Sequence, residues 1–349
     1  MDTTSPSAPS TRRTRFVCIS DTHSSTVKLP KGDVLIHAGD LTNQGSYSEL
    51  SKAMQWLEKA DLRPRLSLQY GPQFHNKVSQ GFAKCISLLS SSSTVTYLCH
   101  GSTTIRLCNP SVPRTKFTVF GSPYSPRTGL WAFGYDRPDA ATDTPDILIT
   151  HTPPYTHRDC DPLTGVLLGC ESLQRTLWRV RPRLHVCGHI HPGRGAERVR
   201  WNPSKPGNTI TSCWEDPAPD SKSSKMSLTN LTARYGNQSL DYSERYEPHA
   251  TGSHPISPTT PPGKFQPSGP NDRVERKSLS EASNPSSVTP AAGTELATNT
   301  SGPAADEGRM GRRETCIVNC AIMATNWPHE RGKKLSKPIV VDLDLPVQR

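Results

Sequence analysis

The chain has few of the residues that build large apolar cores, and it has no long apolar run. Only 33% of its 349 residues are hydrophobic, 6% are aromatic, and the mean hydropathy is -0.60. No run approaches the ~20 apolar residues that span a bilayer, and no secretory signal precedes Arg15. The 33 prolines further predict that part of the chain is disordered. We therefore expect a cytoplasmic protein that does not bind membranes.

Several catalytic and structural motifs are also missing. The ten cysteines include no Cys-x-x-Cys pair and no framework spacing, which favours reduced cytosolic thiols over disulfides. The sequence has neither a glycine-rich phosphate loop nor a Gly-x-Ser-x-Gly elbow. Cys99 and Arg106 are one residue too far apart for the Cys-x5-Arg loop of cysteine-based phosphatases. These absences exclude several common routes to phosphate chemistry.

Acidic residues are outnumbered, 31 against 41 basic ones, which gives a net charge of +10. This charge favours an anionic partner. Residues 202–313 are nearly balanced, so the excess lies in the rest of the chain. The basic stretch Arg179–Arg183 lacks the interleaved aromatic residues of a nucleic-acid surface. We expect a small anionic substrate, such as a phosphate compound, and no nucleic-acid polymer, and no feature identifies a protein partner.

Strand-like and helix-like segments alternate, which predicts an α/β fold. We expect a disordered tail over 1–14, a folded domain over 15–201, a low-complexity disordered insert over 202–313, and strands over 314–346 that complete the same domain. Strands are predicted near 16–19, 33–38, 95–98, 104–108, 116–120, 147–150, 184–187, 196–201 and 338–343, and helices near 47–60, 82–89 and 170–180.

Four short patches of potential metal ligands each follow a strand-like run. They are Asp21-Thr22-His23, Gly39-Asp40, Thr150-His151 and Gly188-His189-Ile190-His191. Polar residues at the carboxyl ends of several strands converge on one edge of a sheet. Two aspartates and four histidines exceed the needs of one tetrahedral zinc and suit a pair of divalent ions. The order and spacing of the patches predict a binuclear metal site.

Two further pairs of polar residues lie near these patches in the sequence. His37 and His185 lie on apolar strands and are predicted to be packed or hydrogen-bonded, not ligands. His157 and Arg158 follow the turn at His151 and are candidate substrate-binding residues, with a solvated loop as the alternative.

The four patches resemble the signature of the calcineurin-like metallophosphoesterases, in the branch of the brain metallophosphoesterase-domain-containing proteins and their fungal relatives. The resemblance covers residues 14–201 and 315–346. It implies a four-layer αββα sandwich with mixed sheets. It also implies one ion held by Asp21, His23, Asp40 and His191, and a second held by His151 and His189 with Asp40 as the bridge.

The activity implied by this resemblance is hydrolysis of phosphodiesters, including cyclic nucleotides, or of phosphomonoesters by a metal-bridging hydroxide. Two ions about 3.5–4 Å apart lower the pKa of water and clamp a phosphate for in-line attack. Aspartate and histidine ligands bind Mn, Fe, Zn or Mg, so the sequence does not identify the metal.

One element of the family signature, Gly-Asn-His-Asp/Glu, is missing, and residues 61–71 occupy its place. Either an error in the gene model or a genuine loss accounts for this. The gap predicts a lost central strand, unpaired sheet edges, a weakened second metal site and impaired hydrolysis. Phe74-His75-Asn76 has the right residue types in reversed order. The alternative function is a non-catalytic remnant that binds a metal, a phosphate ligand or a partner.

Overall fold

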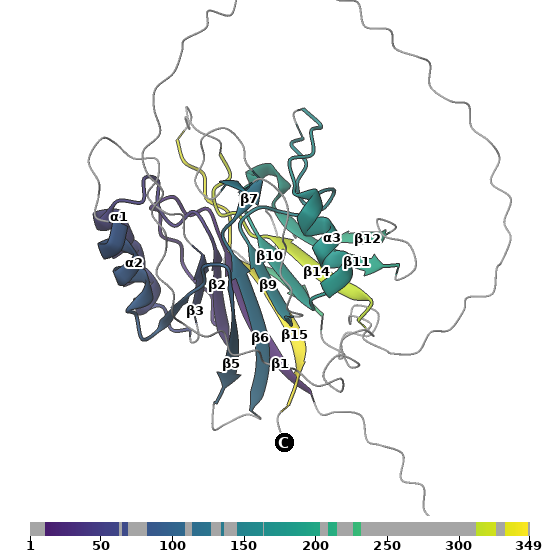
Figure 1. The fold of residues 1–349 in the computed structure, drawn as a ribbon, viewed down its shortest axis with the longest axis horizontal. Coiled ribbons are helices and arrows are strands. Elements are labelled where there is room, and N and C mark those ends of the chain that lie inside the picture. The colour runs from purple at the N-terminus through teal and green to yellow at the C-terminus, as the bar shows by residue number, and fades with distance from the viewer. Residues whose placement is uncertain are drawn as a thin grey trace, which may run out of the picture. The chain divides into compact units, whose positions relative to one another are not determined.

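We describe the fold from a computed structural model of the chain (Figure 1). The structure describes residues 11–62, 65–68, 82–108, 114–126, 134–135, 145–162, 164–202, 209–214, 226–231, 312–325 and 332–347. The predictions made for residues 1–10, for Phe74-His75-Asn76 and for most of 202–313 lie outside the described residues. None of the described helices is long and apolar enough to cross a membrane.

Two mixed β-sheets form the centre of the fold. The first sheet has the strand order β13-β15-β1-β2-β3-β4. Its strands are β1 (Thr11–Ile19), β2 (Val34–Ala38), β3 (Arg65–Leu68), β4 (Val95–Tyr97), β13 (Ser227–Asn230) and β15 (Ile339–Pro346). The second sheet has the order β12-β11-β14-β10-β9-β6-β5. Its strands are β5 (Gly101–Leu107), β6 (Thr115–Ser122), β9 (Ile147–Thr150), β10 (Leu184–Cys187), β11 (Gly195–Trp201), β12 (Thr209–Trp214) and β14 (Glu314–Asn319). A small ribbon pairs β7 (Ser125–Pro126) with β8 (Gly134–Tyr135).

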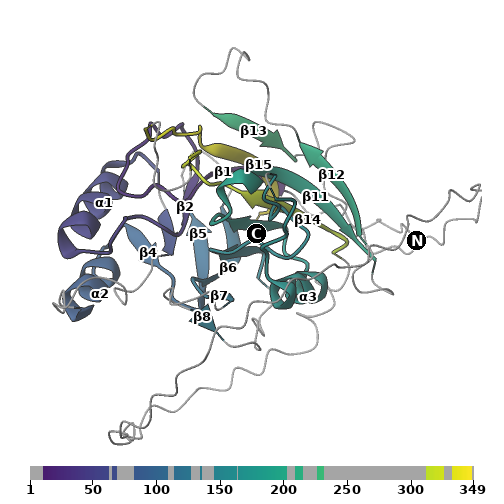
Figure 2. The same cartoon turned by 90° about the horizontal axis from the view of Figure 1, so that it is seen from above.

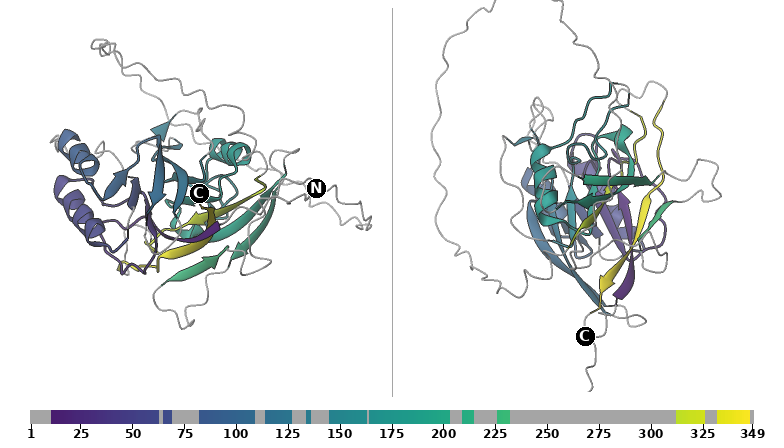
Figure 3. Two further views of the ribbon diagram at one scale, coloured as in Figure 1. Left: turned by 90° about the horizontal axis from the view of Figure 1, so that it is seen from below. Right: turned by 90° about the vertical axis from the view of Figure 1, so that its right-hand side faces the viewer.

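Helices cover the outer face of each sheet. Helices α1 (Tyr47–Lys59) and α2 (Phe82–Ser90) pack on the first sheet through an apolar cluster that includes Leu50, Met54 and Leu89. Helix α3 (Glu171–Val180) packs on the second sheet through Leu177. A third cluster fills the space between the two sheets. Figures 2 and 3 show α1 and α2 on one side and α3 on the other. The predicted four-layer αββα sandwich with mixed sheets is confirmed.

The central strands of both sheets run parallel, which places their carboxyl ends together. In the first sheet β1, β2, β3 and β4 are parallel neighbours, and in the second β6, β9, β10 and β14 are. The loops that follow β1, β2, β9 and β10 meet at one edge of the sandwich, which we call the site rim (Figure 1). Such crevices at strand ends are where α/β sheets place ligands.

The predicted loss of a central strand is wrong. Strand β3 lies between β2 and β4, so the first sheet has no gap there. Leu66 belongs to the core between the sheets. Arg65 is 1% exposed, and its guanidinium donates to carbonyl groups of Glu58, Ala60 and Thr94. The charge of this buried arginine suggests a surface loop, so the sequence does not predict the short strand.

Two strands lie inside the segment that the composition assigns to a disordered insert. Strand β12 pairs with β11, and β13 pairs with β15. Both are edge strands, which pair with a neighbouring strand on one side only. For these strands the insert prediction is wrong. Strand β1 also begins at Thr11, earlier than the predicted start at Arg15, because β15 pairs with it up to Pro346.

A buried ion pair joins β1 to β15, two strands far apart in the chain. Asp342 is fully buried, and each of its carboxylate oxygens lies 2.7 Å from a nitrogen of Arg15. We expect Asp342→Asn to lower the free energy of unfolding by roughly 1.5–2 kcal/mol, the size of a lost charged hydrogen bond, discounted because Arg15 is partly exposed.

The control for this substitution is an ion pair on the surface. Arg175 lies 3.9 Å from Glu171, and both side chains are exposed. Arg175→Ala should change the free energy of unfolding by less than ~0.5 kcal/mol. Urea denaturation measures both variants. Equal effects of the two substitutions would show that the buried pair adds no stability.

Candidate metal centre

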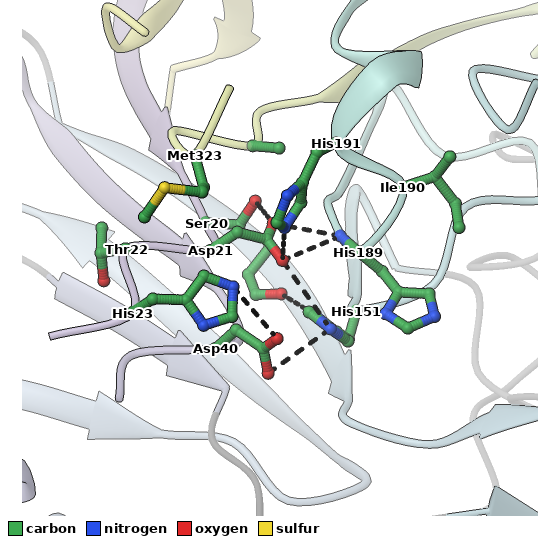
Figure 4. A network of polar contacts seen from close by, with 12 residues as sticks. Ser20, Asp21, Thr22, His23, Asp40, His151, His189, Ile190, His191 and Met323 are labelled. Carbon is green, nitrogen blue, oxygen red and sulfur yellow. Dashed lines mark hydrogen bonds and ion pairs between the residues drawn. The ribbon is translucent and has the colours of Figure 1, made fainter. Parts of the chain in front are cut away.

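The potential ligands follow four strands and converge at the site rim (Figure 4). The shortest contacts between them are all carboxylate to imidazole. His191 Nε2 lies 3.4 Å from Asp21 Oδ1, and His23 Nε2 lies 3.6 Å from Asp40 Oδ2. His151 Nε2 lies 3.6 Å from Asp40 Oδ1 and 4.0 Å from Asp21 Oδ1. The first sheet thus supplies the carboxylates and the second supplies most of the imidazoles.

Two groups of donor atoms are compact enough to hold an ion. One group is Asp21, His23 and His191, and the other is Asp21, Asp40 and His151. Within each group the donor atoms lie within 4.8 Å of one another. Carboxylate oxygens and imidazole nitrogens suit Mn, Fe or Zn, so the residues present fit the predicted cofactor. Asp21 belongs to both groups, whereas the resemblance gives the shared role to Asp40.

His189 stands apart from these two groups. Its backbone N–H donates to Asp21, at 3.0 Å from Oδ2. Its ring lies against that of His151, with centroids 4.9 Å apart (Figure 4). Burial lowers the pKa of His189 to about 3, so the ring is neutral at physiological pH. Its predicted role as a metal ligand stays a prediction.

The backbone at the predicted ligands adopts a conformation that only glycine reaches easily. The φ angles are 52° at Asp21, 45° at His23, 53° at Asp40 and 66° at His189. Left-handed backbone at a non-glycine residue costs of order 1–3 kcal/mol and clusters at functional sites. Hydrogen bonds between the turns hold it in place, since Asp21 N–H donates to Gly39 O and His23 N–H donates to Asp40 O.

Two glycines allow the ligand-bearing turns to pack against each other. A Cβ on Gly39 would lie 2.4 Å from His151 Nδ1, and a Cβ on Gly188 would lie 2.2 Å from Asp21 Oδ2. The glycines that directly precede Asp40 and His189 in the sequence are therefore a signal for close packing of the turns. Glycine at both positions is a steric requirement of the site.

The tautomer of His151 follows from its hydrogen bond. His151 Nδ1 lies 2.9 Å from Ala38 O, which can only accept, so Nδ1 carries the proton. Nε2 is then the ring nitrogen that faces Asp21 and Asp40, in position to bind a metal. Fixing the orientation of a ligand ring through its second nitrogen is a common feature of metal sites.

A buried histidine supports each half of the rim. His37 Nε2 donates to the Thr22 hydroxyl, 2.9 Å away, and that hydroxyl donates to Leu41 O. This bond links the turn after β1 to the turn after β2. In the second sheet His185 Nε2 donates to the Thr150 hydroxyl, 2.8 Å away, which donates to the Thr152 carbonyl. Both histidines are packed and hydrogen-bonded, as the sequence predicts.

The two carboxylates differ in their electrostatic environment. Burial favours the neutral form of Asp21, but hydrogen bonds from His191 and Ser20 and the charge of nearby imidazoles outweigh it and lower its pKa. The Ser20 hydroxyl is 2.5 Å from Asp21 Oδ2. Burial is also the largest influence on Asp40, and there it raises the pKa. A cation between the two carboxylates would offset this cost of burying charge.

His157 and Arg158 are held against β11, and their predicted role in substrate binding stays a prediction. His157 is 1% exposed, and its Nδ1 lies 2.5 Å from Glu197 Oε1. The Arg158 guanidinium donates to Ala196 O and lies over Gly195. Both side chains anchor the loop after His151 to β11. The physical reason is Glu197, a buried carboxylate on that strand that needs cationic or donor partners.

Several known proteins are similar to this chain in amino-acid sequence. The chain is 36% identical over 201 residues to Metallophosphoesterase domain-containing protein 1 of Homo sapiens, which covers 52% of this chain and 62% of that protein. It is 31% identical over 201 residues to a UPF0046 protein of Caenorhabditis elegans, which covers 52% of this chain and 70% of that protein. The chain belongs to the calcineurin-like metallophosphoesterase family.

A third relative bears a different name. Probable rhamnogalacturonate lyase C of Emericella nidulans is 37% identical over 206 residues, which covers 54% of this chain and only 18% of that protein. No family model matches the chain. The chain thus spans about three fifths of the human relative and less than a fifth of the fungal one. Membership of this metallophosphoesterase family rests on the first two relatives.

The family's Gly-Asn-His triplet does not occur anywhere in the sequence. Strand β3, which would precede it, ends at Leu68, and residues 69–81 lie outside the described residues. The missing signature would follow the carboxyl end of β3, which lies at the same rim as the metal ligands.

Proposed function

We propose that the chain is a metal-dependent phosphoesterase that hydrolyses phosphodiesters, including cyclic nucleotides, or phosphomonoesters. The observation that carries this proposal is the meeting of Asp21, Asp40, His23, His151 and His191 at one rim, in two groups that share Asp21. Membership of the metallophosphoesterase family supports it. We further propose a cytoplasmic location, because each of the nine cysteines whose side chains the structure describes is a free thiol.

The burial of the ligands suggests how a substrate approaches. Asp21 and His151 are fully buried and form the floor of the site. The side chains of His23, Asp40 and His191 are between 15% and 23% exposed and border the solvent. Divalent ions bound there would supply Lewis-acid chemistry, polarising a phosphoryl oxygen and lowering the pKa of water. The protein's own contribution is to hold the carboxylates and imidazoles in position before substrate arrives.

We propose that turnover is reduced in this chain. Among the described residues, the two ligand groups contain no histidine other than His23, His151 and His191. General acid-base assistance is typically worth ~10²–10⁴-fold in rate. The missing Gly-Asn-His triplet would remove such assistance at the leaving group. The same absence favours the second candidate function, a non-catalytic remnant that binds a metal, a phosphate ligand or a partner.

Metal stoichiometry and hydrolysis together separate these two functions. The full chain is loaded with Mn²⁺ or Zn²⁺, dialysed and analysed for bound metal, and then assayed with bis(p-nitrophenyl) phosphate and p-nitrophenyl phosphate. We expect two ions per chain and slow hydrolysis that a chelator abolishes. Asp40→Asn should lose one ion and most of the activity.

The control for these assays is His157→Gln, which alters the anchored loop and leaves every proposed ligand in place. Full activity in Asp40→Asn would refute the proposed site. One ion or none, with no hydrolysis by the wild-type chain, would establish the remnant.

A further inference from the structure

A pair of exposed aromatic rings lies on the site rim outside the ligand groups. His100 follows β4 and directly precedes β5. Its ring centroid lies 5.1 Å from that of Tyr124 and 5.3 Å from that of Phe120. His100 and Tyr124 are both exposed, Tyr124 to 39%, whereas Phe120 is buried beneath them. The two rings thus form an aromatic surface on an apolar base.

Hydrogen bonding fixes this surface close to the ligands. His100 Nδ1 lies 3.0 Å from the Ser122 hydroxyl at the end of β6. Ser122 is the register partner of Thr150 in β9, the residue immediately before His151. Strand β6 lies between β9 and β5, the strand that begins next to His100. Because neighbouring strands are about 4.8 Å apart, His100 is held about two strand spacings, roughly 10 Å, from the end of β9 that leads to His151.

The backbone at His100 has the same unusual conformation as the ligand turns. Its φ is 53°, in the left-handed region that Asp21, His23, Asp40 and His189 also occupy. Residues held there carry a conformational cost that the surrounding structure must offset. The His100 side chain is also exposed to solvent. A strained, fixed and accessible ring is suited to contact a ligand.

We propose that His100 and Tyr124 form a platform for a planar ring in the alcohol part of the phosphate ester. This inference rests on the proposed function, because it requires the phosphate to bind at the metal centre. Flat groups gain from contact with a pre-positioned aromatic surface, since little side-chain entropy is lost on binding. The platform makes the site selective for aryl and nucleoside esters over alkyl and sugar esters.

Binding of matched ligand pairs tests the platform without relying on turnover. Calorimetry on the Mn²⁺-loaded chain compares adenosine 5′-monophosphate with ribose 5-phosphate, which differ only in the base. A second pair is phenyl phosphate and methyl phosphate. It shows whether the ligand's ring contacts the platform when the ring is bonded directly to the ester oxygen, or only when a sugar lies between them. We expect the ring-bearing member of at least one pair to bind roughly 3- to 10-fold more tightly, as aromatic contacts allow.

Two variants assign that preference to the platform. His100→Asn removes the ring but keeps a residue that tolerates left-handed backbone, and Tyr124→Leu removes the second ring. Each should reduce the preference to less than twofold and leave affinity for ribose 5-phosphate unchanged. Tyr47→Leu, at an exposed tyrosine on α1, is the matched control and should retain the full preference.

The outcomes separate the platform from the proposed function. Equal affinity of the wild-type chain for both members of both pairs overturns the platform. So does a preference that survives His100→Asn and Tyr124→Leu. If the phosphates bind but no ester is hydrolysed, the phosphoesterase activity fails while the ratio of affinities still decides the platform. If no phosphate binds to the metal-loaded chain, both inferences are overturned.

Discussion

Replacing Gly188 by alanine should lower metal affinity by roughly 10- to 100-fold or more, the range found when groups that orient metal ligands are removed. The added Cβ would lie 2.1 Å from Ser20 Oγ and 2.2 Å from Asp21 Oδ2. Real Cβ atoms do not approach other atoms so closely, so Asp21 must move. Because Asp21 belongs to both ligand groups, one methyl group disturbs both. Titration with Mn²⁺ or Zn²⁺ against a chromogenic chelator measures the loss.

A matched glycine elsewhere on the rim provides the control. A Cβ on Gly101 meets nothing within 4 Å, so Gly101→Ala should bind metal like the wild type. Circular dichroism shows whether Gly188→Ala keeps its fold. If folded Gly188→Ala binds metal as tightly as Gly101→Ala does, the close packing of the turns at Asp21 is not needed for metal binding.

Mild acid should destabilise the protein through the two buried support histidines. Burial lowers the pKa of His37 and of His185 from 6.5 to about 3. Between these values the unfolded chain binds protons that the folded chain excludes, so stability falls as pH falls below 6.5. Each group costs about 1.4 kcal/mol per pH unit. From pH 7 to pH 5 the pair should remove roughly 4 kcal/mol from the free energy of unfolding.

Urea denaturation at the two pH values measures this loss, and substitution assigns it. The His37→Gln and His185→Gln variants keep an N–H donor for Thr22 and Thr150 but cannot take up a proton. The double variant should lose less stability on acidification than the wild type by approximately the amount assigned to the pair. An identical loss in both proteins would show that other groups govern the acid response.

Much of the ligand arrangement could be predicted from sequence, because it depends on local patterns. Each ligand follows a run of apolar residues, and the parallel strands bring the ends of those runs to one edge. The helices follow equally local signals. Ser46 and Glu49 form a capping box that begins α1, an arrangement that fixes a helix start from four residues.

What the sequence did not show depends on contacts made across the fold. Arg65 lies in a central strand because carbonyls from α1 and Thr94 accept its donors, and no local pattern reports such partners. His157 is turned inward by Glu197, forty positions along the chain. His100 is placed at the same edge as the ligand strands by its bond to Ser122 and by the register of β6 with β9. Register and side-chain orientation come from tertiary packing, which a single sequence leaves open.

The placement of β14 and β15 has a consequence for protein synthesis. Strand β15 lies between β13 and β1, and β14 lies between β11 and β10, so two strands that are translated after the other described strands are interior members of the sheets. While a ribosome is still translating the residues before Glu314, β1 and β10 each expose an edge of unpaired backbone groups. Exposed edges promote association between chains. The nascent polypeptide therefore carries unpaired strand edges in both sheets until β14 and β15 emerge, and a transcript with a premature stop codon before Glu314 encodes a product that cannot close either sheet.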